Sequence, residues 1–111
     1  VKLLNQARIL LGFGTDGGVP NPQTFGRFVG YFDHVELELL VESGLTPMEA
    51  LTVATGNSAK MMRLDHLGVI APGKAADLLV LDADPLQDIK NTRRINSVWL
   101  AGRRLQAPGT N

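Results

Sequence analysis

The chain has 111 residues, enough for one modest core, and its 44% hydrophobic content is that of an ordinary globular protein. The 11 basic side chains balance the 11 acidic ones, which argues against a dedicated nucleic-acid surface, because such a surface needs excess positive charge. There is no cysteine, so disulfides and thiolate metal ligands are excluded, and no apolar run is long enough to span a bilayer. We therefore expect no nucleic-acid or membrane partner, and a cytoplasmic location by default.

The first residues have apolar side chains at helical spacing and look like the last turns of a helix that begins upstream. We therefore expect the chain to be a piece of a longer protein. The apolar run from Ile9 to Thr15 then predicts a strand buried on both faces, as in the parallel sheet of an α/β protein. The run ends abruptly at Asp16, and Gly17 and Gly18 follow it into a loop.

Asp16 is the first candidate for chemistry. Active sites of α/β folds lie at the carboxyl ends of the strands, which is where Asp16 stands in this prediction. The alternative is a turn residue that caps its own loop, and the local pattern leaves both interpretations open. The Gly-x-Gly-x-x-Gly pattern from Gly12 to Gly17 is not typical of a dinucleotide site, because prolines follow it where a helix should begin.

Two helix starts follow the loop. Asp33 with Glu36 three residues later is similar to a capping box, and it predicts a helix that ends near Gly44. The segment from Thr46 to Glu49 is a full capping box with proline at the first helical position. Gly56 is expected to end this second helix, before a short third helix over residues 58–64.

His34 and His66 are the two histidines of the chain. We expect His34 at the first position of the helix capped by Asp33, on the side that faces Asp16. It could contact a substrate or a metal there, or it could be a surface imidazole at a helix start. His66 is expected to be structural.

From Leu67 onward the pattern indicates a small β element. Residues 68–74 are expected to form a short strand and a Pro-Gly turn. Further strands are expected at residues 76–82 and 95–100, with a return strand through residue 105 after a hairpin turn. Asp77 is expected to cap the turn formed by Pro72 and Gly73.

Several stretches together resemble the amidohydrolase superfamily, specifically its imidazolonepropionase-like and prolidase-like metal-dependent hydrolases. The matching stretches are Gly14-Thr15-Asp16, His34, Glu36 to Leu51, Ala54 to Ala59, Leu67 to Asp82 and Val98 to Arg103. Their order and spacing extend over nearly the whole chain, which makes the resemblance strong.

The resemblance implies an α/β fold class, with the last strand and helices of a TIM-type (β/α)8 barrel followed by part of a small β-sandwich. Residues 1–66 would form the C-terminal end of the barrel, with its last strand, active-site loop and helices. Residues 67–111 would form the C-terminal part of the β-sandwich domain. A whole barrel of this type needs about 250 residues, so most of it would lie upstream.

The resemblance also implies a metal-dependent hydrolase that acts on a C–N bond of a small molecule, in an amide, a cyclic amide or a dipeptide. Asp16 would be the general base and a metal ligand, while Gly17, Gly18 and His34 would contact the substrate. Zinc is the first candidate for the divalent metal, with one or two ions. The family's other metal ligands belong upstream, so the chain alone is expected to bind no metal and to be inactive.

The alternative is a non-catalytic remnant or a stand-alone interaction module that lacks the metal site. A piece of a barrel leaves apolar surface and strand edges exposed. We therefore expect self-association, or packing on the missing N-terminal part.

Overall fold

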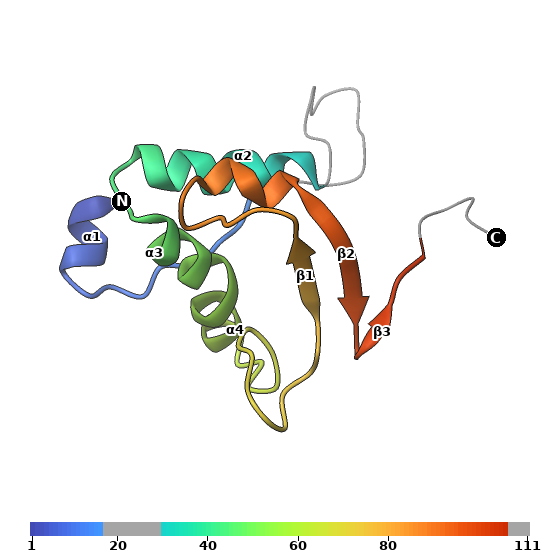
Figure 1. The fold of residues 1–111 in the computed structure, drawn as a ribbon. Coiled ribbons are helices and arrows are strands. Elements are labelled where there is room, and N and C mark those ends of the chain that lie inside the picture. The colour runs from blue at the N-terminus through green and yellow to red at the C-terminus, as the bar shows by residue number, and fades with distance from the viewer. Residues whose placement is uncertain (17–29, 107–111) are drawn as a thin grey trace.

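The computed structural model describes residues 1–16 and 30–106. The elements, in chain order, are α1 (Lys2–Gln6), α2 (Tyr31–Glu42), α3 (Pro47–Thr52), the π-helical turn η1 (Val53–Asn57), α4 (Ser58–Met61), β1 (Leu78–Leu81), the 3-10 helix η2 (Ile89–Arg93), β2 (Ile95–Leu100) and β3 (Arg103–Arg104). Helix α2 lies along η2, and the α3–η1–α4 rod descends beside the sheet (Figure 1). None of the helices in the described ranges is long and apolar enough to cross a membrane, and the cytoplasmic location stays a prediction.

The core joins residues from three helices. Leu37 of α2, Ala50 of α3 and Ile89 of η2 are buried together, and five partly buried side chains pack against them: Phe13, Leu40, Val41, Leu51 and Ala54. Ile89 comes from the second of the two units predicted from the sequence, so both units contribute to one core in this structure. The division at residue 66 itself stays a prediction.

The β element agrees largely with the sequence prediction. Strands β1, β2 and β3 form an antiparallel sheet in that order, with Leu79 opposite Val98. The short strand expected within residues 68–74 is wrong, because turns and bends occupy residues 65–69. The turn expected at Pro72 and Gly73 is confirmed, and the Lys74 N–H closes it on the Ala71 carbonyl. Asp77 was also misplaced: its carboxylate accepts the Ala101 N–H at 2.7 Å, because strand pairing brings the hairpin turn beside it.

The capping box at Thr46 is confirmed. The Glu49 N–H donates to the Thr46 hydroxyl at 3.3 Å, and the Thr46 N–H donates to the Glu49 carboxylate at 2.7 Å. Hydrogen bonds from the Thr46 N–H and the Thr46 hydroxyl to the Glu49 carboxylate lower the pKa of Glu49. Local chemistry therefore fixes this helix start, and the Asn5 amide adds a hydrogen bond to the same carboxylate at 2.8 Å.

The start of α2 differs from the prediction. Gly30, at φ +86°, is the N-cap, and Asp33 is the third helical residue, where its carboxylate accepts the Gly30 N–H at 3.2 Å. Asp33 thus supplies the second half of a capping box, and glycine reaches the positive φ of the cap without strain. His34 is consequently the fourth helical residue and not the first.

The helix from Pro47 does not end at Gly56. It continues through η1 into α4, and Asn57 has helical angles and makes no side-chain cap. A Cβ at Gly56 would meet the Gly68 carbonyl oxygen at 3.6 Å, an ordinary van der Waals distance, so this contact does not require glycine there. The close approach is at Gly68, at φ +83°, where a Cβ would lie 2.6 Å from the Ala59 Cβ. Gly68 therefore lets the chain after α4 pack against the helix.

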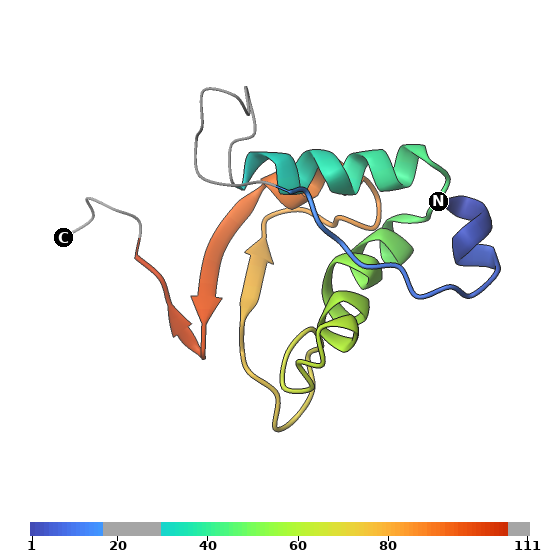
Figure 2. The same ribbon diagram turned by 180° about the vertical axis from the view of Figure 1, so that it is seen from behind.

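The run from Ile9 to Thr15 is not a strand in this structure, so the strand expected here does not form within the described residues. Ile9 is 52% exposed and Leu10 is 41% exposed. A strand requires hydrogen bonds from a neighbouring strand, and the described sheet contains only β1, β2 and β3. The run instead extends from α1 past α3 to the N-terminal end of α2 (Figure 2).

Candidate functional site

The segment that leads to Asp16 lies close to α4. The Phe13 N–H donates to the Ser58 hydroxyl at 2.9 Å, and the Ser58 hydroxyl donates to the Val53 carbonyl at 2.8 Å. A Cβ at Gly12 would lie 2.8 Å from the Met61 sulfur, so glycine permits this approach. The segment is therefore fixed by contact with a helix, although no strand in the described part of the chain pairs with it.

A second contact precedes Asp16 directly. The Thr15 hydroxyl donates to the Asp33 carboxylate at 3.3 Å, which links the segment to the first turn of α2. Asp16 is exposed and has φ +51°, in the left-handed region. Aspartate and asparagine are among the few residues other than glycine that visit this region routinely. The backbone thus turns at Asp16, while Gly17 and Gly18 lie outside the described residues.

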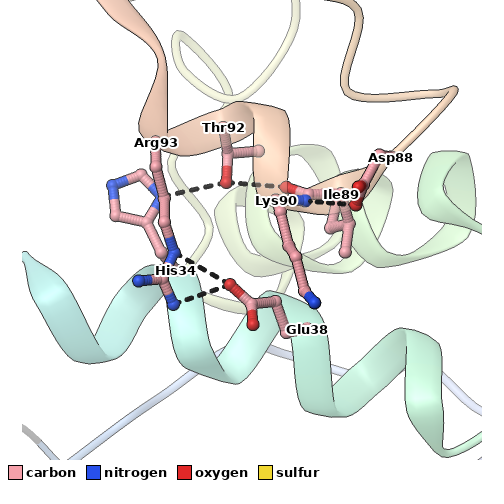
Figure 3. Close-up of polar contacts among 7 residues, drawn as sticks. All are labelled: His34, Glu38, Asp88, Ile89, Lys90, Thr92 and Arg93. Atoms are coloured by element: carbon pink, nitrogen blue, oxygen red, sulfur yellow. Dashed lines mark hydrogen bonds and ion pairs between the residues drawn. The ribbon is translucent and has the colours of Figure 1, made fainter.

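His34 faces η2 from α2. Its Nδ1 lies 2.9 Å from the Thr92 hydroxyl, which donates its only proton to the Ile89 carbonyl (Figure 3). The Nδ1 atom must therefore carry the proton of this hydrogen bond, which leaves Nε2 as the acceptor of the neutral ring. Burial, with the nearby Arg93 charge, lowers the pKa of His34, against the opposing effect of Asp33 and Glu38. The neutral ring is thus favoured.

An ion pair accompanies this contact. Arg93 Nη2 lies 2.6 Å from Glu38 Oε1 (Figure 3). The Arg93 guanidinium also stacks over the Tyr31 ring, at 4.9 Å from the ring centre. The histidine contact and the ion pair together hold η2 against α2. The sequence did not predict η2, whose start Asp88 caps by accepting the Lys90 N–H.

A metal site is not complete within the described part of the chain. Residues 1–16 and 30–106 contain no group of three His, Cys, Asp or Glu side chains that could hold a metal ion. Asp16 could supply one oxygen ligand, and His34 could offer only Nε2. A zinc site in a protein needs at least three such ligands. The residues present therefore do not form the centre by themselves.

Comparison with known proteins identifies the family. The family model described as "Amidohydrolase family" matches residues 1–105. The chain belongs to the amidohydrolase family. The family resemblance drawn from the sequence is thereby confirmed, and members of this family are generally metal-dependent hydrolases.

Individual amidohydrolases match over different lengths. Ochratoxinase of Aspergillus niger is 29% identical over 94% of this chain and 21% of its own length. Imidazolonepropionase of Pyrobaculum arsenaticum is 56% identical over 35% of this chain and 10% of its own length. The crystal structure of phenylurea hydrolase B superposes with a TM-score of 0.83 and 30% identity, covering 95% of this chain and 26% of that one.

The chain therefore spans only a small part, 10% to 26%, of the amidohydrolases that it matches. The similarity to these enzymes supports the α/β amidohydrolase class, while the described residues themselves form a small three-stranded sheet with helices.

Two positioning contacts escaped the sequence analysis. Asp33 was interpreted only as a helix cap, and Ser58 only as a helix residue. Capping patterns lie within a few residues of each other, whereas the contacts of these side chains reach Thr15 and Phe13 across 18 and 45 residues. No pattern in the sequence marks such distant pairs.

Proposed function

We propose that the longer protein containing this chain is a metal-dependent hydrolase that cleaves a C–N bond of a small molecule. The observation that carries the proposal is the family match over residues 1–105, with Asp16 at the exposed end of a segment held by two helices. The bond would belong to an amide, a cyclic amide or a dipeptide. In this proposal residues 9–15 form the last barrel strand once the upstream strands lie beside them.

Asp16 is the general base in this proposal and also a ligand of the metal. A divalent metal, with zinc as the first candidate, lowers the pKa of a water that it binds. Asp16 accepts a proton from the attacking water and returns it to the leaving nitrogen, as a carboxylate at hydrogen-bonding distance can do. The remaining metal ligands come from outside the described residues.

The substrate contacts are part of the same proposal. Gly17 and Gly18 follow Asp16 directly and would let the backbone approach the substrate. His34 presents Nε2 as a hydrogen-bond acceptor, because its Nδ1 proton is used by Thr92. A substrate N–H is the group that such an acceptor would bind.

The decisive test is Asp16→Asn in the full-length protein. We expect kcat to fall about 10²–10⁴-fold, the usual contribution of a general base, with an unchanged melting temperature. Asparagine suits this test because it also tolerates the left-handed backbone at residue 16. Near-normal turnover would refute the assignment. Asp65→Asn, at an exposed carboxylate beyond α4, is the matched control and should leave kcat unchanged.

We also propose that apolar side chains of this chain pack on the rest of the longer protein. Leu3 is 79% exposed, Leu100 is 55% exposed and Ile70 is 90% exposed. Deprived of their partners, such side chains favour association. Gel filtration of the isolated 111-residue chain should therefore show dimers or larger species, and a monodisperse monomer would count against this packing.

A further inference from the structure

We propose that Asp33 and Ser58 are positioning residues, which hold residues 13–16 from two different helices and thereby fix the Asp16 carboxylate for proton transfer. This inference rests on the proposed function. Neither side chain needs to touch the substrate, because each acts through the backbone or the neighbour of Asp16.

The Asp33 carboxylate uses both of its oxygens. Oδ1 accepts the Thr15 hydroxyl proton at 3.3 Å, and Oδ2 accepts the Gly30 N–H at 3.2 Å. One side chain thus connects the residue before Asp16 to the N-terminus of α2. An asparagine at this position offers a single acceptor oxygen and cannot accept both protons in this arrangement.

The Ser58 hydroxyl both accepts and donates a hydrogen bond. It accepts the Phe13 N–H at 2.9 Å and donates to the Val53 carbonyl at 2.8 Å. The second bond crosses the π-helical turn η1, and such turns occur frequently at functional sites. Ser58 is therefore held by its own helix while it holds Phe13.

The helix that carries Asp33 is itself well supported. Leu37 is buried in the core, and the Arg93–Glu38 ion pair joins α2 to η2. A displacement of Thr15 relative to Asp33 would thus move the segment and not the helix. Between the two anchors lies Gly14, where an added Cβ would meet no atom within 4 Å.

The hydrogen bonds at Phe13 and Thr15, on either side of Gly14, define the path of the chain up to Asp16. Catalysis is sensitive to such placement, since a shift of about 1 Å can cost about 100-fold in rate. Removing the hydroxyl at Thr15 or at Ser58 should consequently reduce turnover through Asp16, with little change in substrate affinity.

The test compares Thr15→Val and Ser58→Ala in the full-length protein with the same substitutions in an Asp16→Asn background. The probes are an aryl amide, a cyclic amide and a dipeptide, and the probe hydrolysed fastest is used. We expect each substitution to lower kcat about 10- to 100-fold at unchanged KM, and to have no further effect once Asp16 is replaced. Thr15→Ser, which keeps the hydroxyl, should restore most of the turnover.

The matched control is Thr52→Val. The Thr52 hydroxyl donates to the Met48 carbonyl within α3 and is exposed, so its loss removes a comparable hydrogen bond away from Asp16. It should leave kcat unchanged. An equal loss of activity in both backgrounds would show a merely structural role for Thr15 or Ser58, and would overturn the proposal. So would full turnover in Thr15→Val.

A double-mutant cycle separates this inference from the proposed function. Thr15→Val, Asp33→Ala and their combination are compared by melting temperature, which requires no substrate. Both substitutions remove the Thr15–Asp33 hydrogen bond, and Asp33→Ala also removes the bond to the Gly30 N–H, so the combined shift should be smaller than the sum of the two single shifts. Additive shifts would refute the Thr15–Asp33 link whether or not the protein is a hydrolase. Full turnover in Asp16→Asn would refute the role of Asp16 as general base. It would also refute a catalytic role for the Thr15–Asp33 hydrogen bond.

Discussion

The contact between α2 and η2 and the segment from Ile9 to Asp16 are built in opposite ways. The α2–η2 contact joins buried Leu37 and Ile89, the His34–Thr92 hydrogen bond and the Arg93–Glu38 ion pair. The segment has exposed apolar side chains at Ile9 and Leu10, and side-chain hydrogen bonds near its end join Phe13 to Ser58 and Thr15 to Asp33.

This difference distinguishes a contact that the described residues form by themselves from a segment whose burial requires other parts of the protein. The α2–η2 contact is formed entirely by described residues, through buried side chains, a hydrogen bond and an ion pair. The segment carrying Asp16 has the composition of a buried strand but no strand partner among residues 1–16 and 30–106, so its burial depends on other parts of the protein. Asp16, the proposed catalytic residue, therefore lies on the part of the chain whose burial depends on residues outside the described ranges.

Truncation of Leu37 should have the largest effect on stability. Leu37→Ala removes buried methyl groups from the core, and we expect a loss of about 2–5 kcal/mol in the free energy of unfolding. The measurement is denaturant unfolding of the full-length protein. Leu39→Ala is the matched control in the same helix, because Leu39 is 51% exposed and its truncation should cost less than about 0.5 kcal/mol. Equal costs would mean that α2 is not anchored as described.

Acidification should have a smaller effect at the same contact, through His34. Its folded pKa lies below the unfolded value of 6.5, so the unfolded chain binds the proton more readily. The neutral His34 ring therefore stabilises the folded state fully above pH 6.5, and this stabilisation is lost as the pH falls through the folded pKa of His34. The melting temperature of the unaltered protein should therefore decrease over this range more than that of His34→Asn, which keeps a donor towards Thr92 but does not titrate. Parallel decreases would contradict the role of His34.

The sequence predicted those elements whose signals are local. The Thr46 capping box, the extended runs of β1 and β2 and the hairpin turn after β2 follow from residues close together in the chain. The failures share one cause. Residues 9–15 were predicted as a strand from their composition, but a strand forms only beside a partner strand. Asp77 was assigned to the nearest turn in the chain, although the sheet brings the hairpin turn at Ala101 beside it.

The candidate site shows the same limit. The position of Asp16 at the end of an apolar run was visible in the sequence, while its supports on α2 and α4 were not, because they depend on tertiary packing. The capping role of Asp33 was visible in part, since its spacing from neighbouring residues indicated a helix start. Its second hydrogen bond, to Thr15, required the fold.

The π-helical turn η1 has a consequence for insertions and deletions. Such a turn holds one residue more than an α-helical turn, and each residue rotates a helix by about 100°. Deleting one residue between Val53 and Asn57 would produce a regular helix, but it would turn the Ser58 hydroxyl away from Phe13. The extra residue thus sets the direction in which the Ser58 side chain points from the helix. Homologues with a one-residue gap at this point should hold the segment before Asp16 through a different contact.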